Sequence, residues 1–324
     1  MSPMAATGKP QTRGTFDARV LTNRPIGPGH CRLVLGVAGF GPSRPGQFVN
    51  VLCNEPDPPG EPKVVDWPDG QLPRLTNPAV AARQPLLRRP LSLAGRADRD
   101  DGTAELTLIH RVVGAGTAWL AEAQAGQVVS VLGPLGKGFT IHRDRALAAV
   151  IGGGVGIPPM LYLAEALTGA GVEVVAFAGA RSAALLPLTL DPAVEPADDG
   201  RPTRCAVEFA ERGAPAVVAT DDGSAGVAGM VHEAFAAWLR ARRPAGEDLA
   251  VYACGPEPMM RAVADVAAGA DAACELALER HMACGIGTCQ GCVVKIKADT
   301  TDGWTYKLVC TDGPVFKAED IIWE

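Results

Sequence analysis

Four cysteines near the end of the chain have the types and spacing of metal ligands. They form the pattern C-x4-C-x2-C-x17-C, made by Cys284, Cys289, Cys292 and Cys310. Three thiolates on one loop and a fourth from a separate segment are typical of a plant-type [2Fe–2S] cluster. The three glycines within the loop let the backbone turn so that its N–H groups face the sulfurs. Structural zinc favours paired C-x2–4-C knuckles, so zinc and unrelated buried thiols are the weaker alternatives.

A second chemical signal is a glycine-rich turn, IGGGVGIPP, after a strongly apolar run. Its glycines are Gly152, Gly153, Gly154 and Gly156. A phosphate can approach a glycine backbone closely and meet the N-terminus of the helix that follows, so these residues are candidates for dinucleotide binding. The strict G-x-G-x-x-G string is broken at Ile157, so a tight strand-to-helix turn without a ligand is the alternative.

Two more predicted strands end in loops that could share one cleft with this turn. YACGPEPMM places Cys254, Gly255 and Pro256 at a strand end, and residues 220–226 (TDDGSAG) form another such loop. In open α/β sheets, ligands bind outside the carboxyl ends of the strands. The strand before residues 181–182 ends without the acidic residue that binds a ribose hydroxyl. Arg181 stands there instead, either to favour a 2′-phosphate or as a solvated surface charge.

The first half of the chain offers a different set of candidates. LRRPLSL places a cationic, a rigid and a hydroxyl side chain on one strand, at Arg89, Pro90, Leu91 and Ser92. Arginine suits phosphate, and a hydroxyl can hydrogen-bond a planar ring. A second strand and the turn after it supply Ile109, His110, Arg111, Gly116 and Thr117. The amides of a helix starting there could take a pyrophosphate, although by composition alone both segments could be ordinary strand edges.

The strands and helices that must position these residues are predicted from apolar and turn patterns, which change along the chain. Short apolar runs between turn residues predict an antiparallel sandwich or barrel over residues 14–143, after a flexible tail at 1–13. Strands alternating with helices predict a parallel sheet over 144–270, and a small cysteine-rich domain follows at 271–324. Residues 54–85 carry eight prolines and interrupt the first domain as a surface insertion. The predicted fold class is therefore α/β plus all-β.

Composition narrows the functional classes. The net charge of −6, without basic blocks, argues against nucleic acid and anionic membranes as partners. The nine cysteines are odd in number and crowd after residue 250, which favours reduced thiols and a cytoplasmic location. The beginning of the sequence lacks the apolar segment of a signal peptide. Residues 146–164 are uncharged, but four glycines and two prolines favour a strand, a turn and a helix over a membrane span.

Together these motifs resemble one family. RPLS, GAGT and GPLGKGF look like the flavin domain of ferredoxin–NADP reductase-type proteins, and GGGVGIPP and YACGPEPMM like their nucleotide domain. The tail, MACGIGTCQGCVVK followed by YKLVCTDGPVF, resembles the electron-transfer subunits of dihydroorotate dehydrogenase B, as does TDDGSAG. The resemblance runs from about residue 15 to 323 and excludes the proline-rich insertion. It implies a flavin-binding β-barrel, a Rossmann-like NAD-binding sheet and a C-terminal [2Fe–2S] domain.

The resemblance also implies cofactors, roles and a partner. The candidates of the two barrel strands would contact FAD, although His110 stands where the family more usually has Tyr, so a stacking contact there is open. Ser92 would hydrogen-bond the flavin, and Cys254 would orient the nicotinamide, unless it is only a small core residue. The cysteines at 284, 289, 292 and 310 would ligate the cluster.

The implied partner is an FMN-containing dihydroorotate dehydrogenase catalytic subunit, in a heterotetramer with two chains of each kind. Electrons would pass from its FMN through the cluster and FAD to NAD+ during pyrimidine biosynthesis, and the chain alone would act as an NADH diaphorase. The alternative is a related NAD(P)H-linked complex of the bifurcating, sulfide or hydrogenase type, with Arg181 keeping NADP open.

Overall fold

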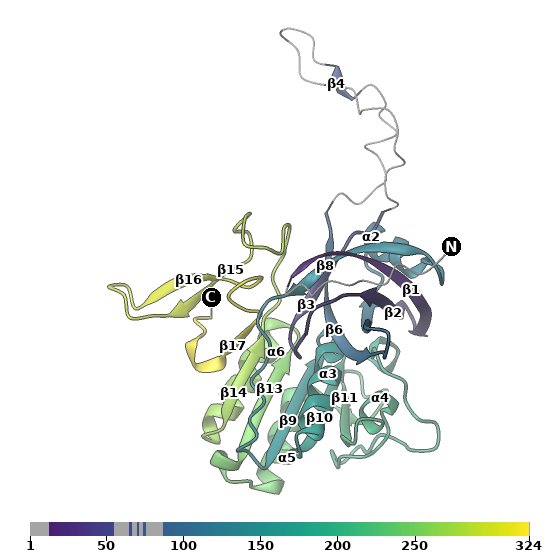
Figure 1. Cartoon of the computed structure of the whole chain (residues 1–324). Coiled ribbons are helices and arrows are strands. Elements are labelled where there is room, and N and C mark those ends of the chain that lie inside the picture. The colour runs from purple at the N-terminus through teal and green to yellow at the C-terminus, as the bar shows by residue number, and fades with distance from the viewer. Residues whose placement is uncertain (1–12, 55–64, 67–69, 71–73, 76–86, 324) are drawn as a thin grey trace.

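The computed structural model describes residues 13–54, 65–66, 70, 74–75 and 87–323. Over these residues the chain forms a closed barrel, a sheet covered by helices on both faces, and a C-terminal lobe beside the sheet (Figure 1). This arrangement confirms the predicted fold class. The predicted tail and most of the proline-rich insertion lie outside the described residues, apart from β4 (Val65–Asp66), which pairs with β5 (Arg74–Leu75).

The barrel has six antiparallel strands in the order β1-β2-β7-β6-β3-β8. These are β1 (Gly14–Gly27), β2 (His30–Ala38), β3 (Phe48–Val51), β6 (Arg89–Asp98), β7 (Thr103–Arg111) and β8 (Val128–Leu135). Alternate residues face the interior, as Leu33, Leu35 and Val37 do on β2. The short helix α2 (Ala115–Ala121) adds Leu120 to the same core. The barrel therefore has a packed interior, and its candidate residues lie at one end of β6 and β7.

The second part is a seven-stranded sheet in the order β12-β11-β10-β9-β13-β14-β17. Its strands are β9 (Leu147–Gly153), β10 (Glu173–Ala180), β11 (Ala216–Thr220), β12 (Val227–Ala228), β13 (Leu249–Cys254), β14 (Ala273–Ala277) and β17 (Val315–Lys317). The first six in this spatial order are parallel and β17 is antiparallel to β14. Every residue of β9, β11 and β13 is buried, as expected of parallel strands covered on both faces.

Helices cover both faces of this sheet. On one face α3 (Ile157–Gly169) and α4 (Val207–Ala210) pack on alternate strand residues such as Ala148 and Val150. On the other face α5 (Val231–Arg242) and α6 (Glu257–Gly269) pack on Ile151 and its neighbours. Short 3-10 turns complete the fold: η1 (Gly154–Gly156), η2 (Ala183–Leu185), η3 (Gly246–Asp248) and η4 (Ala318–Asp320).

The uncharged stretch at 146–164 is formed by β9, η1 and the first part of α3, as its glycines and prolines predict. Within the described part of the chain, every helix is too short or too polar to cross a membrane.

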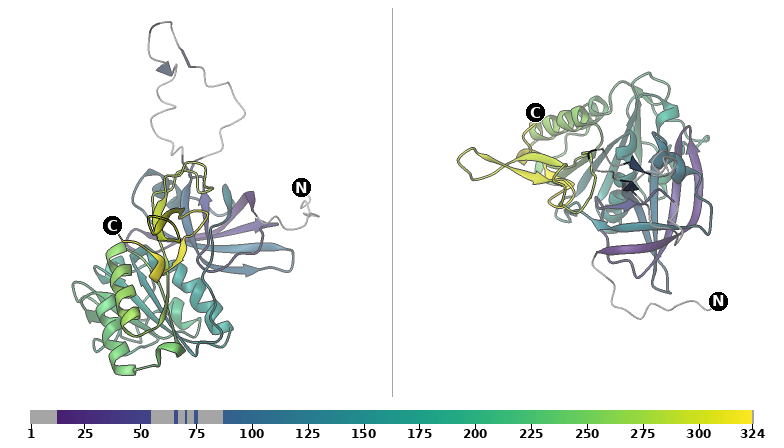
Figure 2. Two further views of the ribbon diagram at one scale, coloured as in Figure 1. Left: turned by 90° about the vertical axis from the view of Figure 1, so that its left-hand side faces the viewer. Right: turned by 90° about the horizontal axis from the view of Figure 1, so that it is seen from above.

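The C-terminal lobe is built around the hairpin of β15 (Val293–Lys297) and β16 (Trp304–Leu308), which projects to one side of the molecule (Figure 2). Its apolar residues join the core on the α5–α6 face of the sheet. A domain boundary at residue 270 would cut this sheet, because β14 and β17 both lie beyond it. The lobe and the sheet therefore share strands.

Candidate functional site

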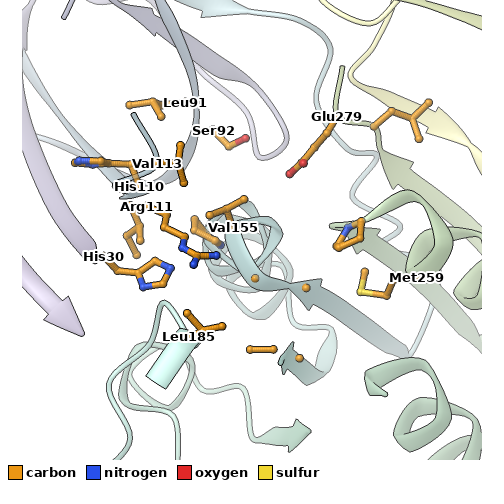
Figure 3. Close-up of a pocket in the computed structure, with 18 of the residues that line it drawn as sticks. His30, Leu91, Ser92, His110, Arg111, Val113, Val155, Leu185, Met259 and Glu279 are labelled. Carbon is orange, nitrogen blue, oxygen red and sulfur yellow. The ribbon is translucent and has the colours of Figure 1, made fainter. Parts of the chain in front are cut away.

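A cavity of about 960 Å³ lies between the barrel and the carboxyl ends of the parallel strands (Figure 3). The structure brings eleven of the candidate residues to its wall: Arg89, Pro90, Leu91, Ser92, Ile109, His110, Arg111, Thr117, Gly153, Gly154 and Pro256. The remaining candidates of these segments lie within two residues of lining positions but do not line the cavity themselves: Gly116, Gly152, Gly156, Cys254 and Gly255. The four cluster cysteines lie outside the cavity. Two sets of candidates from distant parts of the sequence thus meet at one site, as ligand binding between two domains requires.

Two neighbouring arginines of the barrel, Arg88 and Arg89, have different surroundings. Arg89 lines the cavity, and a Cβ added at Gly116 would come within 2.8 Å of its Nε, so the glycine leaves room for the guanidinium. Arg88 points the other way and donates to the carbonyl and hydroxyl oxygens of Ser130, both at 2.9 Å. Because successive strand residues face opposite sides, Arg89 faces the cavity and Arg88 links two barrel strands. Arg89 donates from Nη1 to the Leu87 carbonyl at 2.7 Å, and its other guanidinium N–H groups suit an anionic ligand.

Thr117 uses its hydroxyl within its own turn. Its Oγ1 accepts hydrogen bonds from the N–H groups of Val113 (2.9 Å) and Gly114 (3.2 Å), and donates to the Gly114 carbonyl (3.0 Å). The loop that enters α2 is therefore fixed by the chain itself. A ligand here would meet a shaped backbone beside Arg111 and His110.

His110 is buried, with 2% of its surface exposed, and it lines the same cavity. Burial lowers the pKa of its imidazole to about 4, so the ring is neutral at neutral pH. Neither ring nitrogen has a hydrogen-bond partner among the described residues. Neighbouring His30, whose pKa burial also lowers, donates from Nδ1 to the Pro28 carbonyl at 3.1 Å. A polar group in the cavity would satisfy His110, so the orphaned nitrogens fit a bound ring with donors and acceptors.

The opposite wall is made by two strand-end turns that touch through their backbones. A Cβ at Gly156 would overlap the carbonyl oxygen of Cys254, and one at Gly255 would come within 3.0 Å of the Gly153 amide nitrogen. The turns after β9 and β13 can approach this closely only because these positions lack side chains. Gly153 and Gly154 then present bare backbone to the cavity, which is what a phosphate or a nicotinamide needs for close approach.

Cys254 lies at the end of β13 with 4% of its surface exposed. Burial, and then the charge of Glu279, raise the pKa of its thiol well above the usual value. The side chain is therefore a neutral thiol, suited to packing or weak hydrogen bonding and not to attack as a thiolate.

Glu279 is a cavity residue that the sequence analysis missed. Its side chain is exposed to the cavity, whose walls nevertheless desolvate the carboxylate and raise its pKa. Figure 3 shows Glu279 and Ser92 entering the cavity from opposite sides. Glu279 lies two residues after the end of β14, so the rule that ligands gather at the ends of parallel strands would have found it. β14 was not among the strands predicted from the sequence, so the residues that follow it were not considered as candidates.

The four cysteines form two pairs. Sγ of Cys284 lies 3.3 Å from Sγ of Cys289 on the outer loop. The hairpin joins the other two, because Cys292 precedes β15 and Cys310 follows β16, and the Cys310 N–H lies 3.4 Å from Sγ of Cys292. Cys292 and Cys310 are buried, whereas Cys289 is exposed. Two sulfurs for each of two iron atoms is the ligand set of a [2Fe–2S] cluster.

The backbone around the outer pair favours thiolates. Burial acts to raise the pKa of the Cys284 thiol, but the N–H groups of Cys289 (3.4 Å) and Ile286 (3.5 Å) hydrogen-bond its sulfur and lower the pKa to about 6. Burial, with Cys292 beside it, raises the pKa of Cys310 to about 11. Across the described residues, no three His, Cys, Asp or Glu side chains converge as tightly as one metal ion needs. Two pairs of sulfurs match the ligand set of a two-iron cluster.

Comparison with known proteins decides the family. Residues 279–322 match the iron-sulfur cluster binding domain of dihydroorotate dehydrogenase B, and residues 150–265 match an oxidoreductase NAD-binding domain. A dihydroorotate dehydrogenase B (NAD(+)) electron transfer subunit from Bacillus caldolyticus is 40% identical over 75% of this chain and 83% of its own length. The chain belongs to this family of electron transfer subunits. The subunit from Desulforamulus reducens is 33% identical over 95% of this chain and 98% of its own.

Solved structures agree on the fold of these electron transfer subunits. A chain of the NADH-dependent reduced ferredoxin-NADP oxidoreductase has a TM-score of 0.68, at 24% identity over 94% of this chain and 90% of that one. The ferredoxin reductase of carbazole 1,9a-dioxygenase has a TM-score of 0.55, at 19% identity over 80% and 67%. The matched domains confirm the expectations of an iron–sulfur site and an NAD-binding sheet.

Proposed function

We propose that this chain is the electron-transfer subunit of a dihydroorotate dehydrogenase that uses NAD+, with FAD bound in the cavity and a [2Fe–2S] cluster on the four cysteines. The observation that carries the proposal is the cavity itself, where the barrel strands and the parallel strand ends meet beside the C-terminal lobe. When bound, the cluster would carry single electrons and FAD would exchange these for the hydride given to NAD+.

The residues of the barrel wall would bind and orient the flavin. Arg89 would face its phosphates, and Ser92 would supply a hydroxyl to the ring. The neutral His110 would offer either ring nitrogen to the bound group, because the low pKa keeps the ring uncharged. The proposal places FAD against this wall because its charged and polar side chains enter the cavity, while glycine backbone forms the opposite wall.

The residues of the sheet wall would hold the nicotinamide. Gly153 and Gly154 would let it approach the flavin, and the neutral Cys254 would support the turn from behind. Glu279, with its raised pKa, could hold a proton near the reacting atoms. Arg181 also lines the cavity, so a 2′-phosphate could find a cation there.

The partner proposed from the relatives' names is a catalytic subunit that oxidises dihydroorotate. We extend this to an FMN-containing subunit in a heterotetramer of two chains of each kind, located in the cytoplasm. Light scattering of the purified complex would measure the stoichiometry. A mass that fits one chain of each kind would contradict the tetramer without affecting the electron path.

The deciding experiment uses this chain purified together with the FMN-containing subunit from the same genome. Dihydroorotate and NAD+ are added, and the absorbance of NADH is followed. We expect NADH to form only when both subunits are present. If no NADH forms while NADH still reduces the flavin of this chain, the cofactors stand but the pyrimidine function fails. A related NAD(P)H-linked electron-transfer complex would then be the better assignment.

A further inference from the structure

One buried amide connects the flavin barrel to the cluster loop. Asn50 lies on β3 with 1% of its surface exposed, and its Nδ2 donates to the carbonyl oxygen of Cys284 at 3.2 Å. In the barrel, Asn50 pairs with Pro90, next to the strand residues that face the cavity. The side chain therefore joins the strand beside the proposed flavin site to a proposed cluster ligand 234 residues away.

The cluster loop is shaped to fit this amide. Gly285 has φ of +71°, and a Cβ added there would overlap the Asn50 amide nitrogen. The same Cβ would lie 3.4 Å from Cδ1 of Leu135, at the end of β8. The bare backbone after Cys284 thus rests directly on the barrel, and the hydrogen bond fixes where it rests.

The barrel holds Asn50 rigidly from the other side. Arg88 donates from Nη1 to the Asn50 carbonyl at 3.3 Å and, from the same guanidinium, to both oxygens of Ser130. Asn50 Oδ1, in contrast, is buried without a hydrogen-bond partner among the described residues. A buried unsatisfied group costs about 1–3 kcal/mol, so packing alone would favour an apolar side chain at this position.

We infer that Asn50 is a positioning residue that fixes Cys284 relative to the flavin strand and thereby sets the rate of electron transfer between the cluster and FAD. The inference rests on the proposed function and deepens it. The step that it controls moves one electron from one cofactor to the other, with no bond made or broken. Asn50 acts through the backbone of Cys284, whose carbonyl oxygen accepts the hydrogen bond.

The test compares two leucine variants of the full-length chain carrying FAD and the cluster. Asn50→Leu keeps the branched shape of the side chain, with bulkier methyl groups, and removes the hydrogen bond to Cys284. Asn23→Leu is the matched control, because Nδ2 of Asn23 donates to the carbonyls of Leu120, Ala121 and Ala123 (2.9–3.1 Å) at the C-terminal end of α2 and not to the cluster loop. Its Oδ1 is also buried and unpartnered, so both variants lose the same kind of group.

The flavin is reduced with NADH, and the reduction of the cluster is then followed by rapid mixing. In Asn50→Leu we expect flavin reduction at the normal rate, cluster reduction slowed roughly tenfold, and changed g-values in the electron paramagnetic resonance spectrum. Asn23→Leu should lose thermal stability but keep the normal rate and spectrum. Loss of the cluster from Asn50→Leu alone, with FAD retained, would also support the inference, since Cys284 then needs the amide to stay in place.

Asn50→Leu with normal cluster reduction and normal g-values would overturn the inference, even if its unfolding temperature fell. Equal slowing in both leucine variants would overturn it too, because the effect would then come from general loosening of the barrel. If NADH fails to reduce the flavin of the unmodified chain, the proposed function fails instead, and the two failures are distinct.

Discussion

Two loops built with glycines hold the proposed cofactors, and they are made in opposite ways. The turn after β9 lies between buried parallel strands, and its glycines meet neighbouring backbone, as Gly156 meets Cys254. The cluster loop lies at the surface, where Cys289 is exposed and thiol sulfurs accept the backbone N–H groups. Neighbouring backbone therefore encloses the first loop, whereas the second is held against the barrel at Cys284 and Gly285 and is open to solvent at Cys289.

The largest expected effect is the loss of the cluster, without loss of FAD, from a variant of the cluster loop. Cys289→Ser removes one sulfur of the outer pair, so the chain should lose the visible absorbance of the cluster while FAD stays bound. Iron analysis and flavin content measure the two outcomes. Cys31→Ser is the control, since Cys31 lies on the barrel strand β2. A normal cluster spectrum in Cys289→Ser would remove this residue from the ligand set.

The next prediction compares the loss of folding stability when a glycine of each loop is replaced by alanine. Gly156→Ala puts a Cβ onto the Cys254 carbonyl and should lower the free energy of unfolding by about 3 kcal/mol, the upper range for overpacking. Gly291→Ala in the cluster loop should be nearly neutral, because its Cβ would meet only Sγ of Cys289, at 3.8 Å. Denaturant titration of both variants measures the difference. Equal losses would show that the two loops are equally preformed.

Acid should destabilise the folded chain through His110, because this residue of the barrel wall is buried in its neutral form. The pKa of His110 is about 4 in the folded chain, below the usual 6.5, so the unfolded chain binds more protons between these values. The contribution of His110 to the free energy of unfolding is therefore fully present above pH 6.5. It falls as the pH is lowered, and about 3 kcal/mol is lost at pH 4. Unfolding free energies at both pH values should therefore differ less in His110→Phe. An identical pH dependence in the two proteins would contradict the buried neutral histidine.

The smallest effect concerns the sheet wall. Glu279→Gln keeps the shape of the side chain and removes its titration. NADH should then reduce the flavin roughly tenfold more slowly, a smaller effect than the loss of a full acid–base catalyst. Rapid-mixing rates over a range of pH measure this. Glu257→Gln is a control, because that carboxylate pairs with Arg280 at 2.7 Å. Unchanged rates and pH profile in Glu279→Gln would leave this residue a wall position only.

The features predictable from the sequence are those set by local patterns. The strand–glycine–helix order around Gly154, the short barrel strands and the cysteine spacing depend on neighbours in the chain, and the structure contains all of them. Asn50, Arg88 and Glu279 were not predicted, because their roles arise from contacts with distant segments. β14 was missed because its sequence, ACELA, mixes polar and apolar residues and three of its five residues are only partly buried. Missing that strand concealed Glu279 as well.

The strand β17 has a consequence for how this chain can be divided or recombined. It lies near the C-terminus, after the last cysteine, and pairs antiparallel with β14 as the edge strand of the seven-stranded sheet. A fragment that ended before the cysteines would lack β17, so the edge of β14 that pairs with it would have unpaired N–H and C=O groups. Such an edge can pair with a strand of another molecule and lead to aggregation. The iron–sulfur lobe is thus not a detachable module. Exchanging it between relatives requires moving the sheet edge with it.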